Sequence, residues 1–196
     1  MNKLDKILTI RYNNVKPASG KILLSEPFMG DFYFKRSVVL LADHNEEGSF
    51  GLILNKPVEV KFSEVLKDFP RFDGGIYLGG PVQNENIFFL HTLGSRLEDS
   101  MEVLDGLWWG GNPDALRDMI ANKQVKPADV RFFLGYSGWA AKQLEGELRK
   151  HSWIVTTAPA TLLLQTPPAH LWSELVTRLG EHYAYWTRFP KDPLLN

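Results

Sequence analysis

The chain has 196 residues, of which 44% are hydrophobic and 23% charged, a composition typical of one globular domain with a substantial core. The formal net charge at pH 7 is -1, from 22 basic and 23 acidic residues, so no broad positive field draws the protein to nucleic acid or to an anionic membrane. There is no cysteine, which excludes disulfide bonds, thiol catalysis and thiolate metal sites.

The first residues of the chain mix charged side chains into apolar ones. They lack the continuous apolar core of a secretory signal peptide. No run of about 18 apolar residues, the length that spans a bilayer, occurs in the sequence. We therefore expect a cytoplasmic protein that has no membrane contact.

Residues 1–19 form a polar arm, and residues 20–196 are predicted to form a single domain. A strand is expected over residues 21–25, and Pro27 stops it. Residues 37–43 and 50–55 are apolar on both faces and are separated by a turn that contains Gly48. This pattern predicts a hairpin of two buried strands.

The middle of the chain alternates between short elements. Apolar residues at positions 62, 65, 66 and 69 have helical spacing. Residues 75–78 are predicted to form a strand with residues 87–91 as its hairpin partner, and residues 101–109 are a further strand candidate.

In the second half, Asn112-Pro113-Asp114 has the residue types that begin a helix. A strand over residues 130–134 is expected to lead through two glycines into a helix from about 139 to 150. A short strand follows at residues 153–155. The last helix begins at residues 166–168 and stops at Gly180, and the tail after it is expected to lie on the surface.

Strands come in adjacent pairs rather than in regular alternation with helices. This order favours an α+β fold with a mixed, mostly antiparallel sheet.

Several short motifs occur in one order along residues 20–180, and with them the chain resembles the YqgE/AlgH family of bacterial proteins. The matching segments are residues 20–27, 34–39, 51–57, 79–82, 133–139 and 143–148, together with His44, His91 and Trp153. The resemblance implies a compact domain with a strongly curved, even barrel-like sheet, which we expect to be flanked by three to four helices. It implies no established activity, catalytic residue or cofactor. One branch of the family is linked to transcriptional regulation of alginate synthesis.

The run from Gly135 to Trp139 is similar to the nucleophile elbow of serine hydrolases. The pattern G-x-S-x-G fails at its fifth position, where Trp139 would crowd the tight contact between strand and helix. The pattern therefore favours Ser137 as the N-cap of a helix. A hydrolase, or another enzyme with a cleft at this junction, is the alternative.

Other polar and glycine positions are candidate binding residues. The glycines near residues 79 and 135 either bind an anion with free N–H groups or serve as turns, which are commoner. His44 and His91 lie at strand ends and either face one cleft or are satisfied by backbone groups. No histidine spacing fits a metal site, and no cofactor motif is present. The candidate set is Asn55, Gly79, Gly80, Pro81, Gly135, Ser137, Gly138, Trp139, Gln143 and Gly146, with His44 and His91.

On the helix predicted from residue 139, Trp139, Gln143 and Gly146 share one side, which we expect to be covered by another segment or a partner chain. The leading hypothesis is a non-enzymatic binding protein that acts in regulation through a partner. Its partner is a protein or a small ligand, and its oligomeric state is left open. Specific DNA binding is not expected, because the net charge is near zero and no recognition helix is evident.

Overall fold

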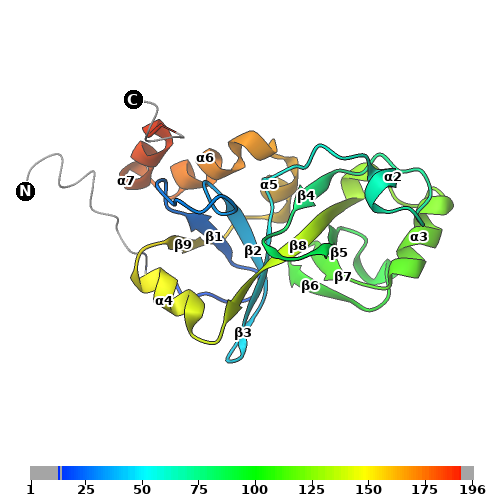
Figure 1. Cartoon of the computed structure of the whole chain (residues 1–196), viewed down its shortest axis with the longest axis horizontal. Coiled ribbons are helices and arrows are strands. Elements are labelled where there is room, and N and C mark those ends of the chain that lie inside the picture. The colour runs from blue at the N-terminus through cyan, green and yellow to red at the C-terminus, as the bar shows by residue number, and fades with distance from the viewer. Residues whose placement is uncertain (1–12, 14, 191–196) are drawn as a thin grey trace, which may run out of the picture.

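A nine-stranded sheet runs through the protein in a computed structural model that describes residue 13 and residues 15–190 (Figure 1). The strand order is β6-β7-β5-β8-β3-β2-β1-β9, and β4 pairs with β8 beside this path. The strands are β1 (Ile22–Ser25), β2 (Val38–Asn45), β3 (Gly48–Ile53), β4 (Ile76–Leu78), β5 (Val82–His91), β6 (Ser100–Leu104), β7 (Leu107–Gly110), β8 (Val130–Ala140) and β9 (Trp153–Thr156). Only the β4–β8 pairing is parallel among them, so the predicted mixed, mostly antiparallel sheet is confirmed.

The sheet is strongly curved but open. A Cβ atom added to Gly20, just before β1, would fall on the carbonyl oxygen of Val103 in β6. The two ends of the strand order therefore curl toward each other, although β6 and β9 stay unpaired with one another. The barrel-like form is thus not closed.

Helices lie at both ends of the sheet. The α-helices are α2 (Phe62–Val65), α3 (Pro113–Ala121), α4 (Gln143–Arg149), α5 (Ala160–Gln165), α6 (Pro168–Arg178) and α7 (Glu181–Ala184). Short 3-10 helices are η1 (Gly94–Arg96), η2 (Pro127–Asp129) and η3 (Tyr185–Arg188). In Figure 1, α4, α6 and α7 lie near β1 and β9, whereas α2 and α3 lie at the opposite end. Most of the expected arm over residues 1–19 lies outside the described residues.

Local sequence signals locate several elements correctly. The β2–β3 hairpin has the predicted turn and pairs Asn45 with Gly48. Asn112 caps α3, because its Oδ1 accepts from the backbone N–H groups of Asp114 at 3.0 Å and Ala115 at 3.1 Å. The tail after Gly180 was expected to lie on the surface, but its Trp186 is buried in the hydrophobic core together with residues of α6.

Strand β8 extends farther than the sequence suggests, and the predicted helix from residue 139 is wrong there. Trp139 still lies in the strand and pairs with Ser49 of β3. Helix α4 begins only at Gln143, after Lys142 with φ of 62°. Pairing with β3 satisfies the backbone hydrogen-bonding groups of this segment. This non-local contact overrides the two glycines, which on their own predict a turn before a helix.

Strands β4 and β5 do not form the expected hairpin with each other. They lie on opposite edges of β8, where Phe133 is opposite both Tyr77 in β4 and Phe88 in β5. The chain must therefore cross β8 between residues 79 and 81.

Glycines make this crossing possible. A Cβ atom on Gly79 would fall on the carbonyl oxygen of Gly135, and one on Gly80 would fall on the carbonyl group of Tyr136. Gly135 has φ of 63°, and a Cβ there would lie 2.6 Å from Asn84 Oδ1. These glycines bring strands β3, β4, β5 and β8 into close backbone contact, and we call this place the glycine crossing.

Two alanine substitutions test the glycine crossing. Gly79→Ala should lower the free energy of unfolding by about 1–3 kcal/mol or more, because the added methyl overlaps backbone atoms. Gly146→Ala in α4 should raise it by several tenths to about 1 kcal/mol, because glycine is a poor helix former. Urea unfolding followed by circular dichroism measures both, and equal effects at the two positions would contradict the crossing.

Candidate functional site

A cavity of about 480 Å³ lies where the N-terminus of α6 meets the segments before β2 and after β3. Its polar and charged lining side chains are Lys35, Arg36, Asn55, Lys56, His170, Ser173 and Thr187. We call this cavity the cationic pocket. Its volume lies within the usual range of small-molecule sites, about 300–1,000 Å³.

Asn55 builds one wall of the cationic pocket. Its Oδ1 accepts from the backbone N–H of Val38 at 2.9 Å, and its Nδ2 donates to the carbonyl oxygen of Arg36 at 2.9 Å. The Asn55 side chain thereby gives the first residue of β2 the hydrogen-bond acceptor that a neighbouring strand would otherwise supply. It also holds Arg36, whose φ is 49°, in the left-handed region.

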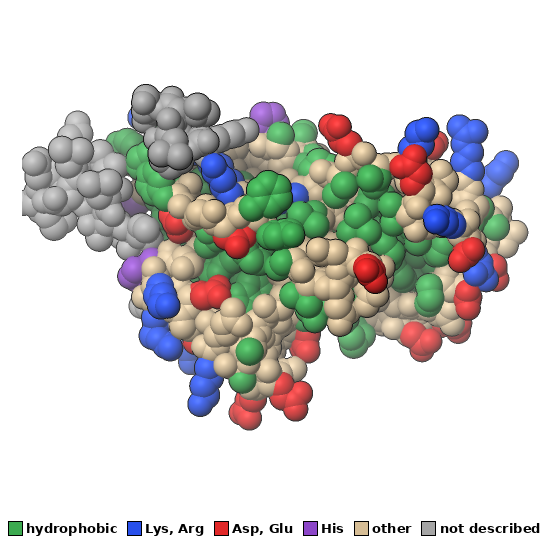
Figure 2. Space-filling view, in the orientation of Figure 1, with side chains coloured by type: hydrophobic (Ala, Val, Ile, Leu, Met, Phe, Trp, Pro, Cys, Tyr) green, Lys and Arg blue, Asp and Glu red, His purple; other side chains and the backbone are tan. Residues whose placement is uncertain are grey.

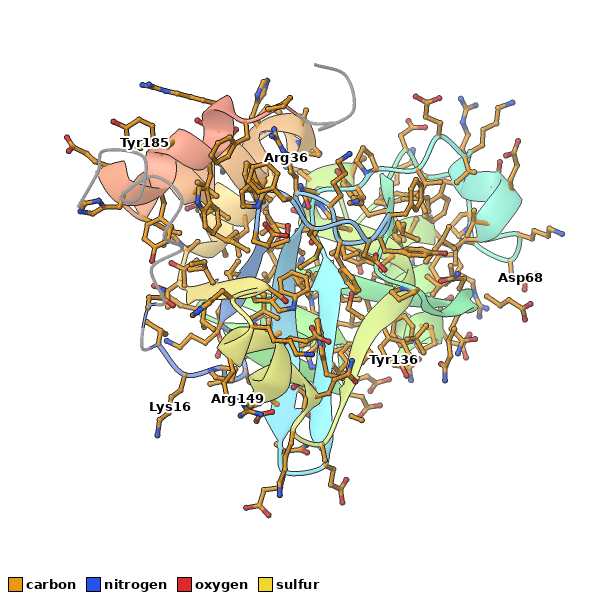
Figure 3. All side chains as sticks on the ribbon, turned by 60° about the vertical axis from the view of Figure 1, so that its left-hand side comes forward. Lys16, Arg36, Asp68, Tyr136, Arg149 and Tyr185 are labelled. Carbon is orange, nitrogen blue, oxygen red and sulfur yellow. The ribbon has the colours of Figure 1, made fainter. Side chains whose placement is uncertain are left out.

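Arg36 reaches from this wall toward α6 (Figure 3). Its guanidinium carbon lies 5.0 Å from the ring centroid of Trp172 in α6. Its Nη2 donates to the carbonyl oxygens of Phe189 and Pro190. Its Nε is buried and has no acceptor among the described residues. Burial lowers the pKa of Arg36.

Lys56 supplies a second cation, held by one hydrogen bond. Its Nζ donates to the carbonyl oxygen of Phe32 at 3.0 Å. Burial lowers the pKa of Lys56; the charge of Asp31 raises it and that of Lys35 lowers it further. Lys35 and Lys56 thus repel each other inside one pocket.

No carboxylate lines the cationic pocket in the described part of the chain. The first turn of α6 adds His170 and the positive end of a helix that has no side-chain N-cap. Three cations and a helix N-terminus therefore face one cavity whose described lining holds no carboxylate. Such an arrangement is electrostatically suited to an anionic group.

Exposed aromatic side chains lie beside the cationic pocket. Phe32, whose carbonyl holds Lys56, is 82% exposed, and Phe28 is 46% exposed. The ring of Phe28 lies 4.7 Å from that of Phe189, which is bonded to Arg36 through its carbonyl. Figure 2 shows exposed hydrophobic side chains in this part of the surface, with both basic and acidic side chains near them. We call Phe28 and Phe32 the aromatic rim.

Of the residues expected from sequence to form a site, only Asn55 lines the cationic pocket. Gly79, Gly80, Pro81 and Gly135 belong to the glycine crossing, where backbone fills the space an anion would need. Gly138 and Trp139 instead line an open groove of about 440 Å³ beside the β2–β3 turn.

The two strand-end histidines do not face one cleft. His44 lies in β2, and its Nδ1 is 2.7 Å from Ser49 Oγ. His91 lies in β5 and is buried; its Nε2 donates to the carbonyl oxygen of Gly110 at 3.2 Å, and its Nδ1 accepts from the N–H of Leu93 at 3.3 Å. Strands β3 and β8 separate the two histidines in the sheet. Each is satisfied locally.

Ser137 is fully buried in the middle of β8. Its hydroxyl donates to the carbonyl oxygen of Gly79 at 3.0 Å. The expected role as a helix N-cap is therefore wrong, because Ser137 lies inside a strand and α4 begins only at Gln143. Ser137 fixes the glycine crossing.

Trp139 and Gln143 attach α4 to the sheet through Glu147. One carboxylate oxygen, Oε2, accepts from the indole N–H groups of Trp139 at 2.9 Å and Trp153 at 2.7 Å. The other oxygen, Oε1, accepts from Gln143 Nε2 at 3.0 Å. Phe34 packs on both indoles. The indole side is therefore covered, as expected for Trp139, by residues of the same chain.

Gly146 does not share this cover. A Cβ atom there would meet only Arg149 Nη2, at 3.8 Å. The expected close approach of another segment at Gly146 is thus wrong within the described residues. That expectation assumed a helix that begins at residue 139 and so places Trp139, Gln143 and Gly146 on one side. Helix α4 begins at Gln143, so Trp139 is not part of it.

In the described part of the chain, no three His, Asp or Glu side chains are grouped as a metal ion would require. The same residues include no helix with the length and apolar character needed to cross a bilayer.

The sequence patterns gave no indication of Lys35, Arg36, Lys56 and His170 as site residues. The run Phe32-Tyr33-Phe34-Lys35-Arg36, which combines aromatic and basic residues next to a buried strand, was the available signal. His170 carries no local signal, because only the fold brings α6 to this wall.

The fold and the pocket define a curved-sheet α+β protein with a cationic cavity at one end of the sheet. The family model described as AlgH-like matches residues 22–184, and the chain belongs to this family.

Relatives of the same length are similar along the whole chain. A UPF0301 protein of Bacteroides fragilis is 41% identical over 197 residues, covering 100% of both chains. A UPF0301 protein of Chlorobaculum tepidum is 40% identical over 189 residues, covering 96% of this chain and 100% of the relative.

Two solved structures share the fold. The solution structure of the AlgH protein from Pseudomonas aeruginosa has a TM-score of 0.71 at 32% identity and covers 91% of this chain and 98% of its own. The crystal structure of protein DIP2367 from Corynebacterium diphtheriae has a TM-score of 0.75 at 23% identity, covering 90% and 95%.

Burial of Ser137 predicts that a fluorophosphonate probe will not label it in the folded protein, because the hydroxyl is inaccessible and already donates a hydrogen bond. Mass spectrometry of the treated protein checks this. Labelling that disappears in Ser137→Ala but persists when exposed Ser63 is replaced by alanine would show a reactive serine instead.

Proposed function

We propose that this protein is a cytoplasmic, non-enzymatic binding protein that acts in regulation by taking up an acidic segment of a partner protein. The cationic pocket carries this proposal. Lys35, Arg36 and Lys56 face a cavity that no carboxylate lines among the described residues. An aspartate or glutamate side chain would compensate these charges and gain charge-assisted hydrogen bonds.

The aromatic rim favours a protein partner over a free anion. Aromatic and arginine side chains are enriched at the centres of protein interfaces, whereas isolated anion sites need no apolar surface. Phe32 is the most exposed of the large apolar side chains in the described part of the chain and lies next to Lys56. A segment with an acidic residue beside an apolar one would contact both features.

The proposed regulatory role passes through this partner rather than through direct contact with DNA. The net charge of -1 provides no extended basic surface for a duplex, and the cations of the cationic pocket line a cavity instead of a flat face. The chain belongs to the same family as the AlgH protein of Pseudomonas aeruginosa, and this relationship supports a role that the two proteins share.

A selection from random short peptides tests the partner chemistry. Peptides retained by the wild-type protein should be enriched in Asp and Glu next to an apolar residue, because the cationic pocket and the aromatic rim lie side by side. The double variant Lys35→Gln/Lys56→Gln should bind the selected peptides at least about tenfold more weakly, a loss of about 1.4 kcal/mol. Fluorescence anisotropy measures these affinities.

The matched control is Lys67→Gln/Arg71→Gln, which removes two charges near α2 and leaves the cationic pocket intact. It should bind as the wild type does. Phe32→Ala should weaken binding equally at low and high salt, whereas salt should weaken the charge contacts. Peptides without acidic enrichment, or equal binding by the two double variants, would refute the proposed site.

A separate measurement concerns DNA. At about 0.15 M salt, where weak phosphate contacts are screened, the protein alone should show no sequence-dependent affinity for promoter over random duplexes. Sub-micromolar binding that prefers one sequence in an anisotropy titration would contradict the proposal that regulation requires a protein partner.

A further inference from the structure

A second cavity, of about 420 Å³, lies between α5 and the ends of β5, β8 and the β6–β7 turn. It shares no lining residue with the cationic pocket, so a ligand here would occupy a different site from the proposed peptide. Its charged lining residues are Asp105, Asp129 and Arg131. We call it the Arg131 cavity.

Arg131 is a half-buried cation without a carboxylate partner among the described residues. Its Nη1 donates to the carbonyl oxygen of Leu54 at 3.1 Å, and its Nη2 donates to that of Leu164 at 3.0 Å. Its guanidinium carbon lies 4.4 Å from the ring centroid of Tyr77.

These contacts position the guanidinium but leave its charge uncompensated. Burial lowers the pKa of Arg131, with a smaller opposing effect from Tyr77. Arginine has five N–H donors, and only two of them have an acceptor in the described part of the chain. A ligand carboxylate would supply both the missing charge and the missing acceptors.

The rest of the cavity argues against a purely anionic ligand. Asp105, in the exposed β6–β7 turn, and Asp129, at the end of η2, bring two negative charges. His91 adds no positive charge, because burial lowers its pKa and its Nδ1 is occupied as an acceptor from Leu93. One oxygen of Asp129 accepts from the N–H of Lys126 at 2.8 Å, and the other can accept from a ligand. These charges favour a ligand with one anionic and one cationic group.

Apolar residues line the remaining wall, at Leu90, Val130 and Leu164. The volume lies near the lower end of the range for small-molecule sites. We propose that the Arg131 cavity binds a free α-amino acid with an apolar side chain. Its carboxylate binds Arg131, its ammonium group faces Asp105 and Asp129, and its side chain contacts the apolar wall.

The test uses the full chain and a panel of free α-amino acids in isothermal titration calorimetry. At least one apolar amino acid should bind with one-to-one stoichiometry. Its amide, which lacks the carboxylate, and its N-acetyl form, which lacks the ammonium charge, should each bind at least about tenfold more weakly, because each loses one charge-assisted contact.

Asp105→Asn should weaken binding of the free amino acid while leaving binding of the N-acetyl form unchanged. The matched control, Asp118→Asn on the exposed side of α3, should bind as the wild type does. Arg131→Gln should abolish binding; since this variant also loses contacts to Leu54 and Leu164, its folding is checked by circular dichroism. If Arg131→Gln does not fold, the result for Asp105→Asn alone tests the proposal.

Chemical-shift changes in the NMR spectrum locate the ligand. They should centre on Thr161 and Gln165 of α5, which line the Arg131 cavity. Failure of the whole panel to bind the folded wild type would overturn the proposal. Equal affinity for blocked and free forms, no response to Asp105→Asn, or shifts centred on the cationic pocket would each do the same.

Discussion

Strand β8 is the element on which the rest of the structure depends. Its first half pairs with β4 and β5 on opposite edges, and its second half pairs with β3. The change of partners requires the chain to cross at Gly79, Gly80 and Gly135, where no side chain fits. Both cavities take their position from this arrangement. Arg131 lies in the first half of β8, and β3, whose first four residues pair with β8, leads through Leu54 into Asn55.

The sequence predicts elements well where local signals are sufficient. The β2–β3 hairpin, the capped helix α3 and the last long helix all follow from apolar spacing and terminal residues near them in the chain. Prediction fails where a distant strand decides. A helix was predicted to begin at about Trp139, yet pairing with β3 keeps Trp139 and Ala140 in a strand. Helix α5 and the crossing of β8 by β4 and β5 likewise depend on contacts that no local pattern contains.

The candidate site was less predictable than the fold. Sequence patterns favoured residues near glycines and strand ends, and most of these turned out to serve backbone crossing or to attach α4. The cationic pocket brings together Arg36, Lys56 and His170, which come from distant segments of the chain. What defines it is that the described residues around the cavity include these cations and no carboxylate. That property belongs to the tertiary structure. Asn55, the one candidate that lines the cationic pocket, lies in the segment 51–57 that carries the family resemblance.

The carboxylate of Glu147 has a consequence for local unfolding. Helix α4 has seven residues, too few for a stable isolated helix, so its order depends on its attachment to the sheet. Both indoles and Gln143 meet this one carboxylate, which makes the attachment cooperative. In native-state hydrogen exchange, α4 would therefore open as one unit at a lower free energy than β8, whose amides exchange only when the sheet itself separates. The free energy of this opening is set mainly outside the helix, by the two tryptophans that hold it.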